Sequence, residues 1–93
     1  MGVDAALEFK RAVGERLARI GARIESLYPR LREGDGVALL MNCYALILGL
    51  WQLADPPACL RELMRRPDMR MFRIDYQTQL AAALAALWKG TAS

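Results

Sequence analysis

The side chains best suited to hold another molecule follow one another at spacings of three, four and three residues: Met41, Tyr44, Leu48 and Trp51. Residues spaced in this way share one face of an α-helix. Methionine and aromatic side chains adapt to irregular apolar partners, and Tyr44 and Trp51 each add one polar group that can orient a ligand. The pattern therefore marks a candidate ligand-binding face. The competing interpretation is that all four residues belong to an ordinary core.

Catalytic chemistry has few candidates in this chain. It contains no histidine, so the commonest general base is missing. Cys43 and Cys59 follow no metal-binding spacing, and a packed Cys59 is a simpler interpretation than a reactive thiol at a helix start. Asp75 is the carboxylate nearest to an apolar stretch, but a hydrogen bond or a salt bridge to Arg70 or Arg73 explains it more simply. We therefore predict a protein that is not an enzyme and that binds no metal and no cofactor.

The composition indicates a small cytoplasmic domain that shares its apolar surface with a second chain. Ninety-three residues allow one domain, residues 1–93, and a domain of this size buries only about 60–65% of its unfolded surface. Hydrophobic residues nevertheless make up 55% of the chain, so we expect part of this surface to be covered by another copy. Two cysteines without a secretion signal favour a reducing cytoplasm.

The charge pattern argues against nucleic-acid binding by these residues alone. The net charge is +3, and the arginines alternate with acidic residues instead of forming one basic block. The bias toward alanine and arginine is typical of bacteria with GC-rich genomes. We therefore expect any contact with DNA to be made by other residues.

The first helix is expected at residues 4–28. Its apolar residues recur at spacings of four, three, four and three: Val13, Leu17, Ile20, Ile24 and Leu27. No strand produces this stripe. Asp4 is a candidate cap for its start, and Pro29 stops it. A glycine-containing loop of residues 30–36 follows, with Asp35 as the candidate cap of the next helix.

The remaining helices are expected at residues 37–54, 57–66 and 70–89. The first of these is apolar nearly all round and should therefore be buried. Asp55, which precedes a proline, predicts the start of the short helix, and Gly90 predicts the end of the last one. No stretch has the pattern of a β-strand. We predict an all-α fold, an antiparallel bundle of three long helices and one short helix, completed by dimerisation.

A membrane span is the competing interpretation of residues 37–54. Eighteen apolar residues are close to the minimum length for crossing a bilayer. Asn42 and Gln52 would be costly in the hydrocarbon region, and no basic cluster flanks either end. We therefore favour a buried helix and predict no membrane contact.

Two stretches resemble the last two large helices of TetR-family transcriptional regulators. The first extends from Tyr44 to Pro56 and contains the run GLWQLADP, and the second extends from Phe72 through Leu80 to Gly90. Residues 4–28 resemble the helix that precedes them in the family, so the likeness spans nearly the whole chain. Its motifs are packing patterns and are moderately specific. The helix-turn-helix head with which family members begin has no counterpart in these residues.

The resemblance implies a regulatory C-terminal domain. In the family, such a domain binds a small, usually apolar ligand between its helices. Its last two long helices pair with their symmetry mates, and ligand binding releases the operator by changing the spacing of the two DNA-binding heads. The expected pocket has the Met41 to Trp51 face as one wall, and a row on the first helix is the candidate for the other: Val13, Leu17, Ile20 and Ile24.

A homodimer interface of at least roughly 1,200 Å² is expected on the second and last long helices. Gly49 admits a close neighbour on a face that it shares with Asn42, Leu46 and Leu53. The alanine-rich last helix is expected to contribute Leu80, Ala83, Leu84 and Leu87, and its Ala82 and Ala86 also offer flat surface. In the competing interpretation, these small residues pack helices within one chain. The alternative function is a small helical protein–protein interaction module or adaptor unrelated to transcription.

Overall fold

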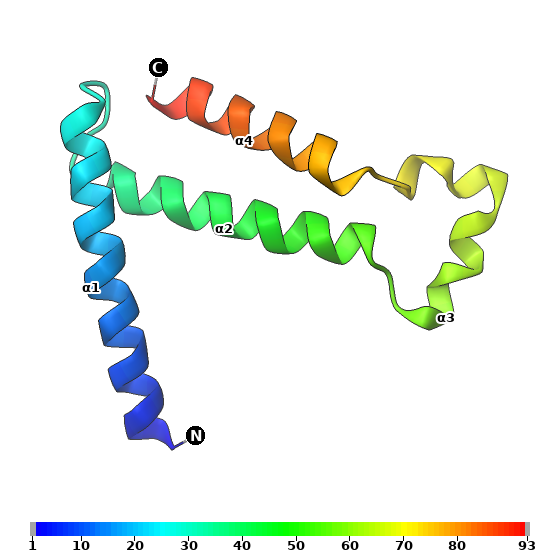
Figure 1. Ribbon diagram of the computed structural model, residues 1–93, viewed down its shortest axis with the longest axis horizontal. Coiled ribbons are helices and arrows are strands. Elements are labelled where there is room, and N and C mark those ends of the chain that lie inside the picture. The colour runs from blue at the N-terminus through cyan, green and yellow to red at the C-terminus, as the bar shows by residue number, and fades with distance from the viewer. Residues whose placement is uncertain (1, 93) are drawn as a thin grey trace. The chain divides into compact units, whose positions relative to one another are not determined.

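The first helix, α1, spans Val3–Leu27, where apolar residues recur with helical spacing. The computed structural model describes residues 2–92 of the chain (Figure 1). Helix α1 begins and ends one residue earlier than the predicted range of 4–28. Tyr28 is its C-cap, and the extended backbone of Tyr28 suits the residue before Pro29, as predicted. The cap predicted at Asp4 was wrong, because Gly2 is the N-cap. Asp4 lies in the first turn, where its negative charge complements the helix dipole.

Helix α2 spans Asp35–Ala54 and begins two residues earlier than predicted. Asp35 does not cap it, because its Oδ2 accepts the backbone N–H of Arg32 at 2.7 Å. The carboxylate of Glu25, on α1, takes that role. Its Oε2 accepts the N–H of Gly34 at 2.9 Å and that of Gly36 at 2.7 Å. Gly34 has a φ of +93°, a left-handed conformation that favours glycine and turns the chain into α2.

The connector between α2 and the last helix is less regular than predicted. The helix expected at residues 57–66 is split into α3, Ala58–Arg61, and the 3₁₀ helix η1, Leu63–Arg65. A second 3₁₀ helix, η2, spans Pro67–Phe72. The cap predicted at Asp55 was also wrong, because Pro57 is the N-cap of α3. Asp55 instead forms an ion pair with Arg61 at 3.5 Å.

The last helix, α4, spans Tyr76–Ala92, so both predicted ends were wrong. Arg73 is extended, and Asp75 starts the helix by accepting the N–H of Gln79 on its carbonyl. The Asp75 carboxylate also accepts the hydroxyl of Thr78 at 2.9 Å. Gly90 lies inside α4 and does not end it. The all-α class, with three long helices and one short α-helix, is confirmed, and residues 2–92 contain no strand.

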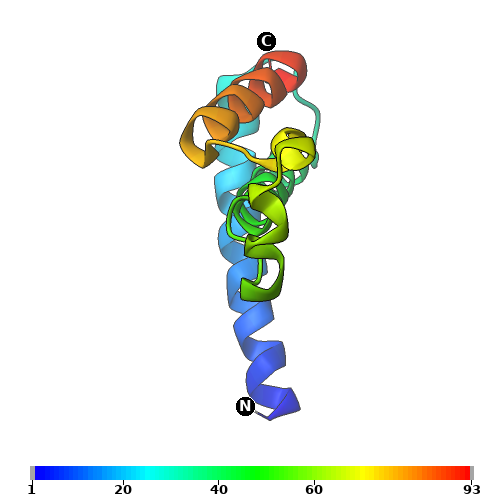
Figure 2. The ribbon, with the colours of Figure 1, turned by 90° about the vertical axis from the view of Figure 1, so that its right-hand side faces the viewer.

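The described chain divides into two compact units. The first consists of residues 2–42 with residues 88–92, and the second is Cys43–Leu87. In the first unit, α1 crosses the first turns of α2 steeply (Figure 1, Figure 2). Gly21 and Gly36 meet at this crossing and are buried. The unit also holds the buried hydrophobic residues of the described chain, Leu31, Leu39 and Ala92.

In the second unit, residues 43–54 of α2 and residues 76–87 of α4 run antiparallel (Figure 1). None of the residues 43–87 is fully buried. One side of each helix is half-buried, including Leu46 and Leu50 on α2 and Leu80 and Leu84 on α4. A pair of apolar helices can cover only one side of each member. The unit therefore leaves apolar side chains on its outer faces.

Candidate functional site

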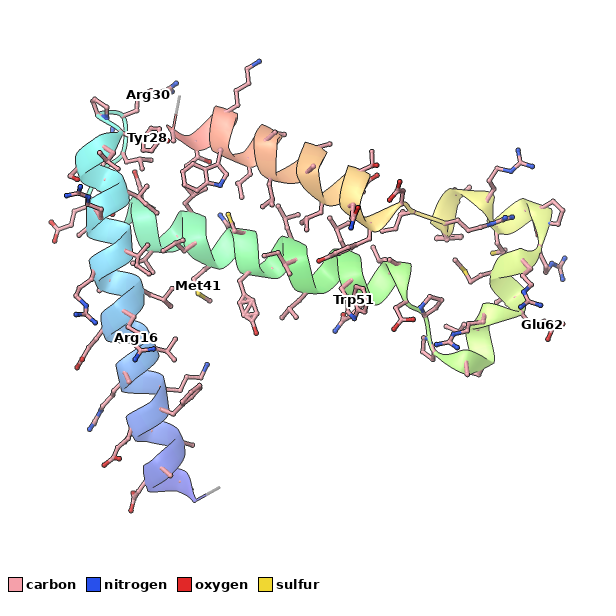
Figure 3. All side chains as sticks on the ribbon, viewed as in Figure 1. Arg16, Tyr28, Arg30, Met41, Trp51 and Glu62 are labelled. Atoms are coloured by element: carbon pink, nitrogen blue, oxygen red, sulfur yellow. The ribbon has the colours of Figure 1, made fainter. Side chains whose placement is uncertain are left out.

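The predicted ligand-binding residues form an exposed stripe along α2. Met41, Tyr44, Leu48 and Trp51 are between 46% and 52% exposed. Figure 3 shows the side chains along α2, with Met41 and Trp51 labelled. Apolar side chains of this size gain about 1.5–3 kcal/mol on complete burial from water, and about half of that gain is still open to these four. The stripe is therefore a surface with a strong tendency to be covered by another apolar group.

Tyr76 holds one end of this stripe in place. Its ring meets the ring of Trp51 edge to face, with centroids 5.4 Å apart and an interplanar angle of 80°. Its hydroxyl donates a hydrogen bond to the carbonyl of Ile47 at 3.2 Å. The start of α4 therefore orients the indole of Trp51. Tyr76 falls within the last helix predicted from the sequence, and nothing local to residue 76 indicates its partner at residue 51.

The residues expected to form the opposite wall lie on α1 in the first unit. Val13, Leu17 and Ile24 are half-buried, whereas Ile20 is 50% exposed. Met41 belongs to the same unit, and Tyr44 and Trp51 belong to the second. A pocket formed with α1 therefore stays a prediction.

The predicted dimer residues fall into two groups by exposure. On α2, Asn42 and Leu53 are exposed, while Leu46 and Gly49 are half-buried. A Cβ placed on Gly49 would meet no atom within 4 Å. The predicted residues of α4 are all half-buried: Leu80, Ala83, Leu84 and Leu87.

The opposite side of α4 is small and exposed. It carries Ala81, Ala82, Ala85 and Ala86, none of which is even half-buried. Short side chains let another helix approach closely. The exposed alanine side of α4 and the Gly49 position on α2 are therefore the places where a second chain can pack most tightly.

The described part of the chain contains no group of three or more Cys, Asp or Glu side chains suited to hold a metal ion. Cys43 is half-buried, Cys59 is exposed, and both are free thiols. The Asp75 carboxylate is engaged by Thr78, which is the structural role expected for it, although the partner is a hydroxyl and not an arginine.

Helix α2 is long and apolar enough to cross a membrane when judged by length and composition alone. The core helix of a soluble protein has the same length and composition, but such a helix is mostly buried. Only Gly36 and Leu39 of α2 are buried within the described chain, so the burial predicted for this helix was wrong for the single chain. Asn42 and Gln52 lie on exposed positions of this helix, where a bilayer would have to accommodate their amide groups.

Comparison with protein families gives one match that covers the whole chain. The family is described as "Tetracyclin repressor-like, C-terminal domain", and its model matches residues 1–93. Comparisons with curated proteins and with solved structures gave no match.

Proposed function

Because this chain belongs to the tetracyclin repressor-like C-terminal domain family, we propose that it is the ligand-binding and dimerisation domain of a bacterial TetR-like transcriptional repressor. It acts in the cytoplasm and is not an enzyme. DNA recognition is assigned to a helix-turn-helix segment outside these residues. A small apolar ligand alters the packing of the helices, and the dimer transmits this change to the two DNA-binding heads.

The observation that carries the ligand assignment is the exposed stripe on α2. Met41, Tyr44, Leu48 and Trp51 leave about half of their surface uncovered. The Tyr44 hydroxyl and the Trp51 indole N–H add two polar groups to this apolar face. A pocket with mostly apolar walls and few polar groups suits a small apolar molecule with one or two hydrogen-bonding atoms.

Dimerisation is supported by the shortage of buried core in the single chain. Leu31, Leu39 and Ala92 are the buried hydrophobic residues of the described part, while many large apolar side chains are exposed. A chain of this size is marginally stable without further burial. A symmetric interface that includes Gly49 and the alanine side of α4 would bury this exposed apolar surface. The same burial explains the apolar character of α2 without a membrane.

Ligand binding is tested by the fluorescence of Trp51. Phenylalanine at position 88 leaves Trp51 as the single tryptophan and keeps an aromatic ring against Tyr28, which Trp88 contacts with ring centroids 5.9 Å apart. The Trp88→Phe protein is titrated with N-phenyl-1-naphthylamine, a neutral apolar fluorophore. We expect saturable energy transfer from Trp51.

Matched variants separate the stripe from other exposed apolar side chains. Tyr44→Ala and Leu48→Ala should each weaken binding about tenfold, since each removes one apolar contact with the ligand. Leu7→Ala removes a leucine of α1 that is 46% exposed, as Leu48 is, and should change the affinity less than about twofold. The ligand assignment would be wrong if no saturable energy transfer from Trp51 were seen, or if all three variants lost affinity equally.

Dimerisation is tested by sedimentation equilibrium at micromolar concentration. We expect twice the 10.4 kDa mass of the chain. Ala82→Arg places a long charged side chain on the exposed alanine side of α4 and should yield monomers, while Ala5→Arg on α1 should leave the dimer intact. A wild-type monomer would exclude the homodimer and favour a helical adaptor that binds a different protein.

A further inference from the structure

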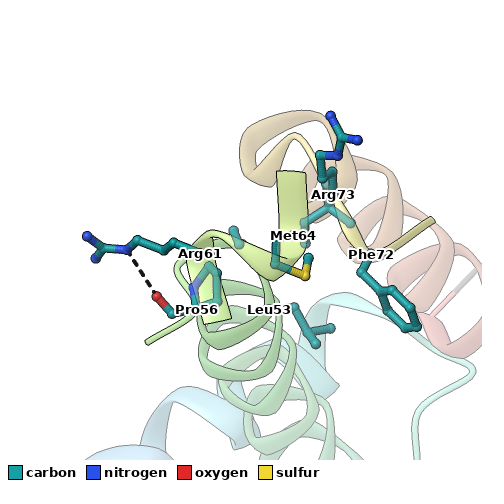
Figure 4. Close-up of a pocket in the computed structure, with 8 residues that line it drawn as sticks. Leu53, Pro56, Arg61, Met64, Phe72 and Arg73 are labelled. Atoms are coloured by element: carbon teal, nitrogen blue, oxygen red, sulfur yellow. Dashed lines mark hydrogen bonds between the residues drawn. The ribbon is translucent and has the colours of Figure 1, made fainter. Parts of the chain in front are cut away.

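A cavity of about 210 Å³ lies in the second unit where the connector folds back against the end of α2 (Figure 4). Both α2 and the connector contribute to its lining: Leu53, Ala54, Pro56, Arg61, Met64, Phe72, Arg73 and Ile74. Leu53 is the only one of these residues that the predicted ligand and dimer faces include. The cavity is thus a different place from the stripe of Met41 to Trp51.

The lining of this cavity combines apolar side chains with nearly as much polar surface, and its rim is cationic. Leu53 and Met64 lie near its centre and Phe72 lies to one side, whereas the head groups of Arg61 and Arg73 extend outward on separate sides (Figure 4). Arginine contributes its aliphatic stem to an apolar wall and keeps its charge near water. An engineered apolar cavity of about 150 Å³ holds benzene, so this one has room for a six-membered ring.

The two arginines differ in how their charge is balanced. Arg61 forms an ion pair with Asp55 at 3.5 Å, and its Nε donates to the Pro56 carbonyl at 3.3 Å. Arg73 donates from Nη2 to the Arg66 carbonyl at 3.2 Å, and no carboxylate of residues 2–92 lies within ion-pair distance of it. Its guanidinium keeps further N–H donors for an anion.

The surrounding connector strengthens this positive field. Residues 61–73 contain five arginines and two acidic residues. The two acidic residues, Glu62 and Asp68, are both exposed. Asp68 forms an ion pair with Arg66 at 3.3 Å. Arg65 and Arg70, like Arg73, have no carboxylate partner in the described chain. A negative group that enters this cavity is therefore favoured by several uncompensated charges.

We propose that this cavity is a second binding site, for a small amphipathic carboxylate whose ring or branched apolar group contacts Leu53, Met64 and Phe72 and whose carboxylate pairs with Arg73. Planar guanidinium and carboxylate groups form two parallel hydrogen bonds, which gives this pairing its geometry. The site does not depend on the neutral-ligand stripe of the proposed function, and either one can be disproved alone.

The test uses benzoate and its neutral isostere benzamide with the full chain. Binding is followed by amide chemical shifts of residues 53–74 and by the Arg73 side-chain Nε–H signal. We expect saturable benzoate shifts confined to this segment. Benzamide should bind at least about tenfold more weakly, because it lacks the charge that Arg73 pairs with.

Three arginine variants decide the role of Arg73. Arg73→Gln should weaken benzoate binding at least about tenfold and leave benzamide binding unchanged. Arg73→Lys should recover part of the loss, since it restores the charge without the fork geometry. Arg70→Gln is the matched control, an unpaired connector arginine outside the cavity lining, and should change the affinity less than about threefold.

Either of two results would overturn the site. The first is an absence of saturable benzoate shifts in residues 53–74 of the wild-type chain at millimolar concentration. The second is an equal loss in Arg73→Gln and Arg70→Gln, which would mean that only the net charge of the connector matters. Helix content measured by circular dichroism checks that each variant is folded.

Discussion

Gly21 of α1 and Gly36 of α2 lie backbone against backbone where the two helices cross. A Cβ on Gly21 would stand 2.8 Å from the backbone nitrogen of Val37 and 3.2 Å from the carbonyl carbon of Gly36. A Cβ on Gly36 would collide with the backbone of Gly21 itself. The steep crossing of the first unit therefore depends on the absence of side chains at both positions.

Alanine at either position should destabilise the protein. We expect Gly21→Ala and Gly36→Ala to cost about 1–3 kcal/mol each, with Gly36→Ala the worse, because its new methyl group meets only backbone. Gly14→Ala is the matched control on α1, where a Cβ meets nothing within 4 Å, and should stabilise the helix by up to about 1 kcal/mol. Urea unfolding at fixed protein concentration measures all three. A stabilising Gly21→Ala would contradict the close crossing.

Glu25→Gln should weaken the junction between α1 and α2. The carboxylate accepts two backbone N–H groups at the start of α2, and its negative charge also favours that end of the helix dipole. We expect a loss of about 1–2 kcal/mol, within the range for hydrogen bonds to a charged group. Glu15→Gln, an exposed position on the same helix, serves as the control and should change the unfolding free energy by less than about 0.5 kcal/mol. Equal effects would show that Glu25 acts only through net charge.

Gly49→Ala separates packing within a chain from packing between chains. Nothing in the single chain lies within 4 Å of the added Cβ, and alanine raises helix propensity by about 0.8–1 kcal/mol. If the Gly49 face packs against a second copy, the added methyl group should weaken dimerisation. A steric penalty of about 1.4 kcal/mol would raise the dimer dissociation constant about tenfold. Sedimentation across a concentration series measures the dimer dissociation constant. A tighter or unchanged dimer would place Gly49 outside the interface.

Tyr76→Phe should loosen the end of the exposed stripe without removing the ring contact. It deletes the hydrogen bond to the Ile47 carbonyl, which we expect to cost about 0.5–1.5 kcal/mol. The near-ultraviolet circular dichroism of Trp51 should weaken as its indole gains freedom. Tyr44→Phe is the control, since the hydroxyl of this half-exposed residue donates no hydrogen bond to another described residue. An unchanged spectrum in Tyr76→Phe would mean that the ring contact alone orients Trp51.

Local pattern was sufficient to predict α1, most of α2 and the faces along these two helices. The stripe on residues 4–28, the proline after Tyr28 and the apolar run of residues 37–54 all act within a few residues, so they predict α1 and most of α2. The spacing that joins Met41 to Trp51 likewise depends only on the 3.6-residue period of one helix. These features could therefore be predicted from the sequence alone.

Features that join distant residues depended on the tertiary structure. The cap of α2 comes from Glu25, in the last turn of α1, and so Asp35 was free to bind Arg32 instead. The last helix starts at Tyr76 because Arg73 is extended and reaches back to Arg66, which a local helix pattern over residues 70–75 does not reveal.

The sequence by itself determined an all-α chain with three long helices, an apolar second helix and a stripe of adaptable side chains on it. Only the tertiary structure decided that Gly21 meets Gly36, that Tyr76 holds Trp51 and that the connector and the end of α2 line an open cavity with Arg73 at its rim. Helix formation follows from hydrogen bonds and side-chain periods between near neighbours. Crossings, ring contacts and cavities follow from which distant surfaces fit together, and a one-dimensional pattern carries no such information.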